Sequence, residues 1–241
     1  MTAQTYETAL VEKIARDPGT KSFRFARPAG YTFTAGQFLQ LALPSPEGPL
    51  VHAFSHADSP TEPHIEITTR LTGSAYKNTL DSLPVGSRVQ IKGPYGKFVF
   101  AYERPRIAFL TGGIGITPVR SMLKYLVDTG GQGRAEGQEI VLFYGSSTVE
   151  GIIYREELEQ FAAALTGCRL IHVISQPSPG WEGHAGHITA RLVRSEINFP
   201  ATWTYYVVGP PGMVAAMQKM LDELEVPAEQ RITEQFAGYD S

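Results

Sequence analysis

The sequence predicts two domains, an N-terminal antiparallel β-barrel and a C-terminal α/β domain built on a doubly wound parallel sheet. Up to about residue 103, short alternating segments are separated by Gly- and Pro-rich turns, a pattern typical of small barrels. From Arg106 onward, apolar runs alternate with amphipathic stretches, which favours βαβ units. We therefore expect domains at residues 1–103 and 104–241, within the one or two domains that 241 residues allow.

Alternation of apolar and polar residues predicts the strands of the first domain. They fall at residues 22–26, 37–43, 64–70, 88–92 and 98–100. Ser74 precedes a segment with helical apolar spacing, and serine is a good N-cap residue, so we expect a short helix to start there.

Continuous apolar runs predict the strands of the second domain, and the amphipathic segments between them predict its helices. Strands are expected at residues 107–110, 140–144, 170–174 and 205–208, and helices at residues 118–127, 155–164 and 211–225. Buried strands joined through helices form a parallel sheet with right-handed crossovers. We expect this sheet to have five strands.

The composition excludes several classes of function. Hydrophobic residues make up 42% of the chain, and 21 Lys and Arg stand against 24 Asp and Glu, a net charge of -3 that predicts neither nucleic-acid nor anionic-lipid binding. The one cysteine, Cys168, excludes a disulfide framework, a cysteine-built zinc site and an iron–sulfur cluster held by this chain. No apolar run is long enough to span a membrane and the N-terminus shows no secretory signal, so we expect a cytoplasmic protein.

A glycine-rich turn, Thr111-Gly-Gly-Ile-Gly-Ile-Thr-Pro118, follows the first strand of the second domain. We expect Thr117 to cap a helix that starts at Pro118, and backbone amides at such a helix start bind phosphate. A tight turn without a ligand is the alternative, because the third glycine of the dinucleotide fingerprint and its acidic residue are missing. The end of the fourth strand, Val208-Gly-Pro-Pro-Gly212, is also poor in side chains, so a flat ligand is expected across both strand ends.

These two turns, together with Ala35-Gly-Gln-Phe38 and Gly93-Pro-Tyr-Gly-Lys-Phe98, resemble the motifs of the ferredoxin–NADP reductase family. The resemblance covers essentially the whole chain. It implies a flavin-binding barrel, a domain that binds a nicotinamide nucleotide, and hydride transfer between the two cofactors at the domain cleft. The cofactors are then FAD and NADH or NADPH.

The flavin motif of that family is Arg-x-Tyr-Ser, and the matching stretch here is His52-Ala53-Phe54-Ser55. The resemblance implies that Phe54 stacks on the flavin ring, that Ser55 lies near flavin N5, and that His52 replaces an arginine that grips phosphate. A histidine is the weaker clamp, so we expect FAD to bind with modest affinity, with Arg70 as a candidate to compensate. The implied flavin-binding residues are His52, Ala53, Phe54, Ser55, Thr68, Arg70, Gly73 and Ser74.

The family also places an acidic residue and an aromatic residue near the flavin at its C-terminus. Here Glu234, Phe236 and Tyr239 stand in that region, and an exposed carboxylate without a role is the alternative for Glu234. Many members carry a cysteine where this chain has Val208. The candidate catalytic residues are Ser55, Thr117 and Glu234.

The resemblance assigns the nicotinamide nucleotide to the turns of the second domain. The implied contacts are Thr111, Gly112, Gly113, Gly115, Thr117, Pro118, Ser146, Ser175, Val208, Gly209 and Pro210. NADP-specific members have Ser-Arg after the third strand of this domain, where this chain has Ser175-Gln176. A phosphate without a charged partner loses its strongest bonds, so we expect NADH, with NADPH as the alternative if Arg155 reaches the phosphate.

The function implied is that of an FAD-dependent NAD(P)H oxidoreductase that passes electrons to a separate protein, either a ferredoxin, a flavodoxin or an oxygenase component. A reductase of free flavin is one alternative, and a non-catalytic flavin-binding subunit of an electron-transfer complex is another. His184-Ala-Gly-His187 has a spacing seen in metal sites, but no acidic or thiol ligand accompanies it, and we expect no metal. The sequence does not indicate an oligomeric state.

Overall fold

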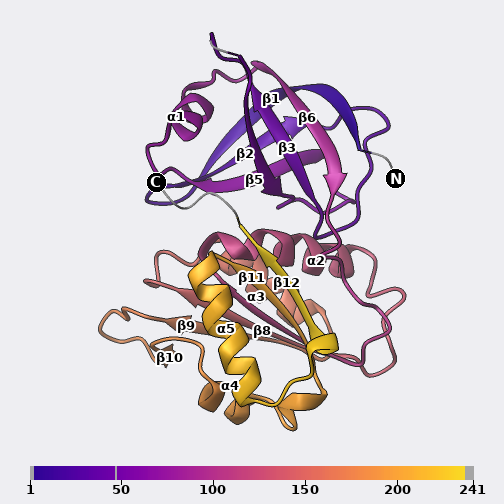
Figure 1. The fold of residues 1–241 in the computed structure, drawn as a ribbon, viewed down its shortest axis with the longest axis vertical. Helices are drawn as coiled ribbons and strands as arrows, with labels where there is room; N and C mark the ends of the chain where they lie inside the picture. The colour runs from indigo at the N-terminus through magenta and orange to yellow at the C-terminus, as the bar shows by residue number, and fades with distance from the viewer. Residues whose placement is uncertain (1–2, 47, 237–241) are drawn as a thin grey trace. The chain divides into compact units, whose positions relative to one another are not determined.

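The computed structural model describes residues 3–46 and 48–236 (Figure 1). Contacts divide the chain into two compact units. The first unit comprises Met1–Phe100 and Thr117–Asp128, and the second comprises Ala101–Ile116 and Thr129–Ser241. The placement of the domain boundary between residues 103 and 104 stays a prediction.

The first unit is a curled, six-stranded antiparallel sheet in the order β4-β3-β6-β1-β2-β5 (Figure 1). Its strands and its short helix are β1 (Gln4–Asp17), β2 (Thr20–Ala26), β3 (Phe38–Leu43), β4 (Leu50–Ser55), β5 (His64–Arg70), α1 (Ala75–Ser82) and β6 (Arg88–Tyr95). The long strand β1 pairs with β6 through its first half and with β2 through its second half. The predicted antiparallel N-terminal domain is confirmed, and so is the helix capped by Ser74.

The core of the first unit comes from one face of each strand. Successive side chains of a strand point to opposite faces, so the apolar core residues recur at every second position. The residues that share this inner face include Leu10, Phe23, Phe25, Leu39, Leu41, Leu43, Ile65, Ile67, Val89 and Ile91. Tyr76 and Leu80 of α1 pack against the same cluster.

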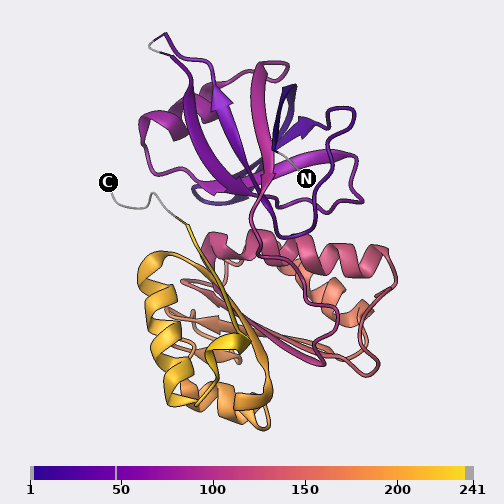
Figure 2. The same cartoon turned by 45° about the vertical axis from the view of Figure 1, so that its right-hand side comes forward.

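The second unit is a six-stranded parallel sheet in the order β10-β9-β8-β7-β11-β12. Its elements are β7 (Arg106–Gly112), β8 (Glu139–Ser146), α3 (Arg155–Ala164), β9 (Cys168–Ile174), β10 (His184–Ala185), α4 (Ala190–Glu196), β11 (Thr204–Gly209), α5 (Pro211–Glu223) and β12 (Arg231–Gln235). Helices α4 and α5 lie on one face of the sheet and α3 on the other (Figure 2). Helix α2 (Ile116–Asp128) continues from β7 through a 3-10 turn at Gly113–Gly115, and from Thr117 on it belongs to the first unit.

Because helices cover both faces, the central strands are buried on both sides and read as continuous apolar runs. Every residue of β11 is buried, as are Ile107–Thr111 of β7. This explains why the strands and helices predicted from apolar runs are all present. The parallel sheet is confirmed, although it has six strands in the described part of the chain rather than the expected five.

The remaining differences concern segments with weak patterns. Residues 98–100 were expected to form a strand but are irregular, although Phe98 and Phe100 are buried. The sequence pattern does not predict β1, β4, α4, β10 or β12, all of which carry mixed burial or are short. Within residues 3–46 and 48–236, no helix has the length and apolar character that a membrane crossing requires.

Candidate functional site

The strand order of the second unit reverses between β7 and β11. Strand β7 comes first in the sequence, β8 to β10 add to one side of it, and β11 and β12 add to the other. In sheets of this kind, ligands bind beyond the carboxyl ends of the strands at such a reversal. Thr111 near the end of β7 is in register with Val208 near the end of β11, so the two glycine-rich strand ends are neighbours.

The turn after β7 is packed tightly on its β11 side. Thr111 Oγ1 donates to the carbonyl oxygen of Val208 at 3.0 Å. A Cβ on Gly115 would lie 2.4 Å from that same oxygen and 2.6 Å from Thr111 Oγ1, closer than real Cβ atoms come. Only glycine therefore fits at residue 115 without moving β11.

The same turn is open at Gly113. This residue has a φ of +52°, and a Cβ built on it would meet no atom within 4 Å. The Tyr144 hydroxyl of β8 donates to the Gly113 carbonyl at 3.1 Å and fixes the turn. A fixed, open backbone just before a helix start is the arrangement that binds phosphate.

Two serines flank this edge on β8 and after β9. Ser146 is buried, and its Oγ has no hydrogen-bond partner among the described residues. The Ser175 amide donates to the Ser146 carbonyl at 3.0 Å, which holds the two residues together. A buried hydroxyl without a partner is unusual and suits a polar ligand. The open turn and this hydroxyl fit a dinucleotide with its phosphates at residue 113.

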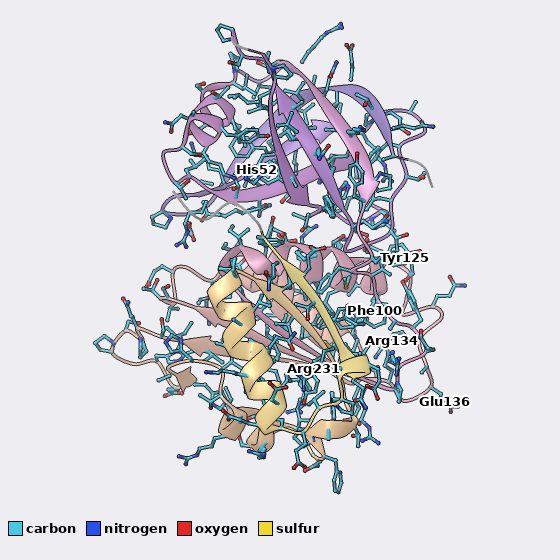
Figure 3. The ribbon with its side chains drawn as sticks, viewed as in Figure 1. His52, Phe100, Tyr125, Arg134, Glu136 and Arg231 are labelled. Carbon is cyan, nitrogen blue, oxygen red and sulfur yellow. The ribbon has the colours of Figure 1, made fainter. Side chains whose placement is uncertain are left out.

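In the first unit, the flavin motif lies on β4 opposite α1. His52 and Phe54 are on the same face of the strand, with ring centroids 4.8 Å apart, and Tyr76 lies 5.2 Å from His52 and 5.8 Å from Phe54. Figure 3 labels His52 in this unit. His52 Nδ1 donates to the Ala53 carbonyl at 2.8 Å. Burial lowers the pKa of His52 below its usual value, with a further contribution from the charge of Lys77, so this imidazole is mostly neutral at pH 7.

Lys77 of α1 completes this cluster, although it belongs to none of the motifs that the sequence shows. Its side chain is buried, its ammonium lies 4.4 Å from the centre of the Phe54 ring, and it donates to Thr69 Oγ1 of β5. Burial lowers the pKa of Lys77 to about 8. The Ser74 cap is the sequence signal that could have pointed to Lys77, because the position where α1 starts determines which of its residues are on the buried face.

The start of α1 offers open backbone beside this lysine. Gly73 has a φ of +80°, and a Cβ there would meet no atom within 4 Å. The Ser74 hydroxyl accepts from the Lys77 amide at 3.4 Å and so caps the helix. An open turn, a helix start and a buried cation fit the phosphate groups of FAD.

The segment that follows Ser55 is fixed by buried polar contacts. Tyr31 Oη lies 2.9 Å from His56 Nε2, and His56 Nδ1 lies 3.0 Å from Asp58 Oδ1. From α2, Arg120 donates to the Ala57 carbonyl and pairs with Glu62. Ser55 therefore ends its strand at a rigid segment. Nothing in the residue pattern had indicated this network.

Comparison with known proteins identifies the family. Residues 7–100 match the family model described as the oxidoreductase FAD-binding domain, and residues 109–219 match the oxidoreductase NAD-binding domain. Ferredoxin–NADP reductase B of Sorangium cellulosum is 31% identical over 195 residues, which cover 79% of this chain and 78% of that protein. The chain belongs to the ferredoxin–NADP reductase-like family of flavin oxidoreductases.

Other relatives are longer or more distant. The NADH-cytochrome b5 reductase-like protein alnC of Emericella nidulans is 34% identical over 156 residues, which cover 64% of this chain but 32% of that protein. The solved ferredoxin NADP+ reductase of Neisseria gonorrhoeae has the same fold, with a TM-score of 0.83 at 18% identity, covering 96% of this chain and 98% of that one.

The predicted site residues fall into two groups that match the two family domains. The flavin candidates lie on the first unit, at β4, β5 and the start of α1, namely His52, Ala53, Phe54, Ser55, Thr68, Arg70, Gly73 and Ser74. Most nicotinamide candidates lie at the carboxyl edge of the second sheet, namely Thr111, Gly112, Gly113, Gly115, Ser146, Ser175, Val208, Gly209 and Pro210. Their contacts with cofactors stay predictions.

The remaining candidates need separate comment. Glu234 of β12 is in register with Val208, and the Phe236 amide donates to the Gly209 carbonyl at 3.3 Å, so both adjoin the end of β11. Tyr239 lies outside the described residues. The expectation that Thr117 caps a helix starting at Pro118 is wrong, because α2 already begins at Ile116 and the preceding 3-10 turn runs straight into it.

Proposed function

We propose that this chain is an FAD-dependent NAD(P)H oxidoreductase that passes electrons to a separate acceptor protein. The observation that carries the proposal is the presence of an FAD-binding and an NAD-binding domain in one chain that has a single cysteine. When bound, FAD accepts two electrons from the reduced nicotinamide and is able to release them one at a time. The single thiol of these two domains is too few to hold an iron–sulfur cluster, so we place the acceptor outside them.

In this proposal, the residues of the chain bind the two cofactors and orient them. Gly113 leaves its backbone open to the phosphates of the nicotinamide nucleotide, and the unpartnered hydroxyl of Ser146 is available to it as a donor. Ser55 is held by the rigid segment that follows it, as its proposed place beside flavin N5 requires. Glu234, in register with Val208 at the end of the second sheet, is the candidate to hold or relay a proton.

The nucleotide proposed is NADH. Gln176, which stands in place of the arginine of NADP-specific members, carries no charge for a 2′-phosphate. Arg155, the alternative source of charge, pairs instead with Glu159 of the same helix, at 2.9 Å. The ratio of kcat/KM for NADH and NADPH tests this choice, and a strong preference for NADPH would overturn it.

The acceptor proposed is a one-electron carrier protein, namely a ferredoxin, a flavodoxin or an oxygenase component. The names of the relatives support this class, since one is a ferredoxin–NADP reductase and another is similar to cytochrome b5 reductases. Each of the two names includes a one-electron carrier protein, ferredoxin or cytochrome b5.

The experiment that tests the proposal is an absorbance spectrum of the purified protein under anaerobic conditions, before and after addition of NADH and then NADPH. We expect a flavin band near 450 nm that bleaches with NADH. A protein that cannot be reconstituted with FAD contradicts the proposal. A flavin band that neither nucleotide bleaches indicates the non-catalytic subunit instead.

A reductase of free flavin is the second candidate function. The observation that favours it is the neutral His52 at the position where the family has an arginine, because a weaker phosphate clamp lets flavin leave. This candidate predicts that FAD exchanges rapidly with the solution and that added free flavin is turned over as a substrate.

A further inference from the structure

A buried cation on α1 has no counter-charge in the described part of the chain. Lys77 is 9% exposed, and its side chain donates to Thr69 Oγ1. Across residues 3–46 and 48–236, it forms no ion pair with a carboxylate. Burying an ammonium is unfavourable unless an opposite charge compensates it, so buried lysines are normally paired.

The groups around Lys77 compensate its charge only in part. The rings of Phe54 and Tyr76 lie 4.4 Å and 5.8 Å from the ammonium, within the range of cation–π attraction. The bond to Thr69 uses one of the three donors of the ammonium. The cluster therefore holds a positive charge in place and leaves donors for an anion.

Lys77 lies close to His52, the position at which the flavin motif of this chain lacks the positive charge of the family's arginine. His52 is in the place of the phosphate-binding arginine, its Nδ1 is engaged with the Ala53 carbonyl, and burial keeps it mostly neutral. Both residues contact Phe54, with the His52 ring stacked on it at 4.8 Å and the Lys77 ammonium 4.4 Å from its centre. The open backbone of Gly73 stands at the start of the helix that carries the lysine.

We propose that Lys77 binds the phosphate groups of FAD, so that α1 supplies the positive charge that β4 supplies elsewhere in the family. The inference rests on the proposed function, because it requires the chain to bind FAD. Under this proposal, the affinity for FAD depends mainly on Lys77 of α1 rather than on a residue of the β4 motif.

The test compares the dissociation constants of FAD and of riboflavin, which has no phosphate, by quenching of flavin fluorescence. The variants are Lys77→Met, which keeps the aliphatic packing on Phe54, and Arg88→Gln, which removes one charge from a side chain that is 86% exposed on the same unit. We expect Lys77→Met to weaken FAD binding about tenfold or more and riboflavin binding less than about twofold. Arg88→Gln should change neither constant.

Two further measurements keep the result independent of folding and of weak riboflavin binding. Adding His52→Arg to Lys77→Met should restore much of the FAD affinity, because the cation returns to the strand. The ³¹P resonances of bound FAD should shift between the wild-type protein and Lys77→Met. Thermal unfolding of each variant checks that the fold is intact.

Several outcomes overturn the inference. Equal losses for FAD and riboflavin would assign Lys77 a packing role only. Unchanged FAD affinity and unchanged ³¹P resonances in Lys77→Met would separate the lysine from the phosphates while leaving the proposed function standing. A wild-type protein that binds no FAD would remove the proposed function and this inference together.

Discussion

At the scale of single residues, two features of the first unit bear on flavin binding. His52 replaces the arginine of the flavin motif, and Lys77 is a buried cation outside that motif. His52 and Phe54 depart from the family pattern of the flavin motif, and the two residues share one face of β4. Arg70 as the compensating charge stays a prediction. The structure also brings Lys77 onto the Phe54 ring, a contact between a strand and a helix 23 positions apart in sequence that no local pattern reveals.

The lowered pKa of Lys77 makes FAD affinity depend on pH. Burial lowers this pKa to about 8 in the flavin-free protein, and a bound phosphate raises it again. FAD binding is therefore at full strength below pH 8 and weakens as the pH rises towards the pKa of the complex, by at most about tenfold per pH unit. Dissociation constants measured from pH 6.5 to 9.5 check this.

The other titratable groups of the cluster do not interfere in that range. The pKa of His52 is lowered, so it titrates on the acid side, and burial raises the pKa of Tyr76 above its ordinary value near 10. Lys77→Met should bind FAD with an affinity that is flat across the same range. A slope that persists in this variant would assign the pH dependence to another group.

At the scale of elements, the glycines of the turn after β7 have different tasks. Gly115 has no space for a Cβ because the Val208 carbonyl of β11 would be 2.4 Å away, whereas Gly113 has space but needs a positive φ. Gly115→Ala forces backbone to move and should lower the free energy of unfolding by about 3 kcal/mol. Gly113→Ala should lower it by about 1 kcal/mol. Urea denaturation of the two variants compares them, and equal losses would contradict this account.

Helix α2 is fixed to the first unit by a buried ion pair. Arg120 is 2% exposed and pairs with Glu62, and this arginine keeps the pKa of Glu62 below its usual value despite burial. Arg120→Met leaves a carboxylate without its partner and should lower the free energy of unfolding by about 3 kcal/mol. Lys124→Met breaks a more exposed pair with Asp128 on the same helix and should lower it by about 1 kcal/mol or less. Denaturant unfolding that ranks the two variants equally would contradict the role assigned to the buried pair.

Elements were predictable from the sequence where burial is uniform. Strands β7, β8 and β11 are continuous apolar runs because both faces are covered, and the helices between the strands show the period of an amphipathic helix. Strand β9 is buried mainly in its second half, which is where its apolar run lies. Strand β12 has no such run, because its five residues are exposed or half-buried at the edge of the sheet. The turns predicted to bind phosphate stand out in the sequence because they need glycine, for lack of space at Gly115 and for a positive φ at Gly113 and Gly73. The buried Tyr31–His56–Asp58 network was not, because hydrogen bonds between distant segments leave no periodic trace.

At the scale of the whole molecule, the chain holds two cofactor domains and a single cysteine, Cys168. Burial raises the pKa of this thiol to about 11, so it is not the reactive thiolate that redox exchange requires. Electrons that enter the chain therefore have to leave through flavin, either while it stays bound or after it dissociates. The two candidate functions differ only in whether the flavin stays bound while the electrons leave.

Removal of free flavin separates these two routes. A reductase that keeps its flavin, as Lys77 would ensure, should oxidise NADH with ferricyanide at an unchanged rate per molecule of bound FAD after gel filtration. A reductase of free flavin should lose that activity with the flavin and regain it when riboflavin is added, which has no phosphate for Lys77 to bind. We expect the first result. Recovery by riboflavin at the rate seen with FAD would favour the free-flavin reductase, because a substrate flavin does not need its phosphates held.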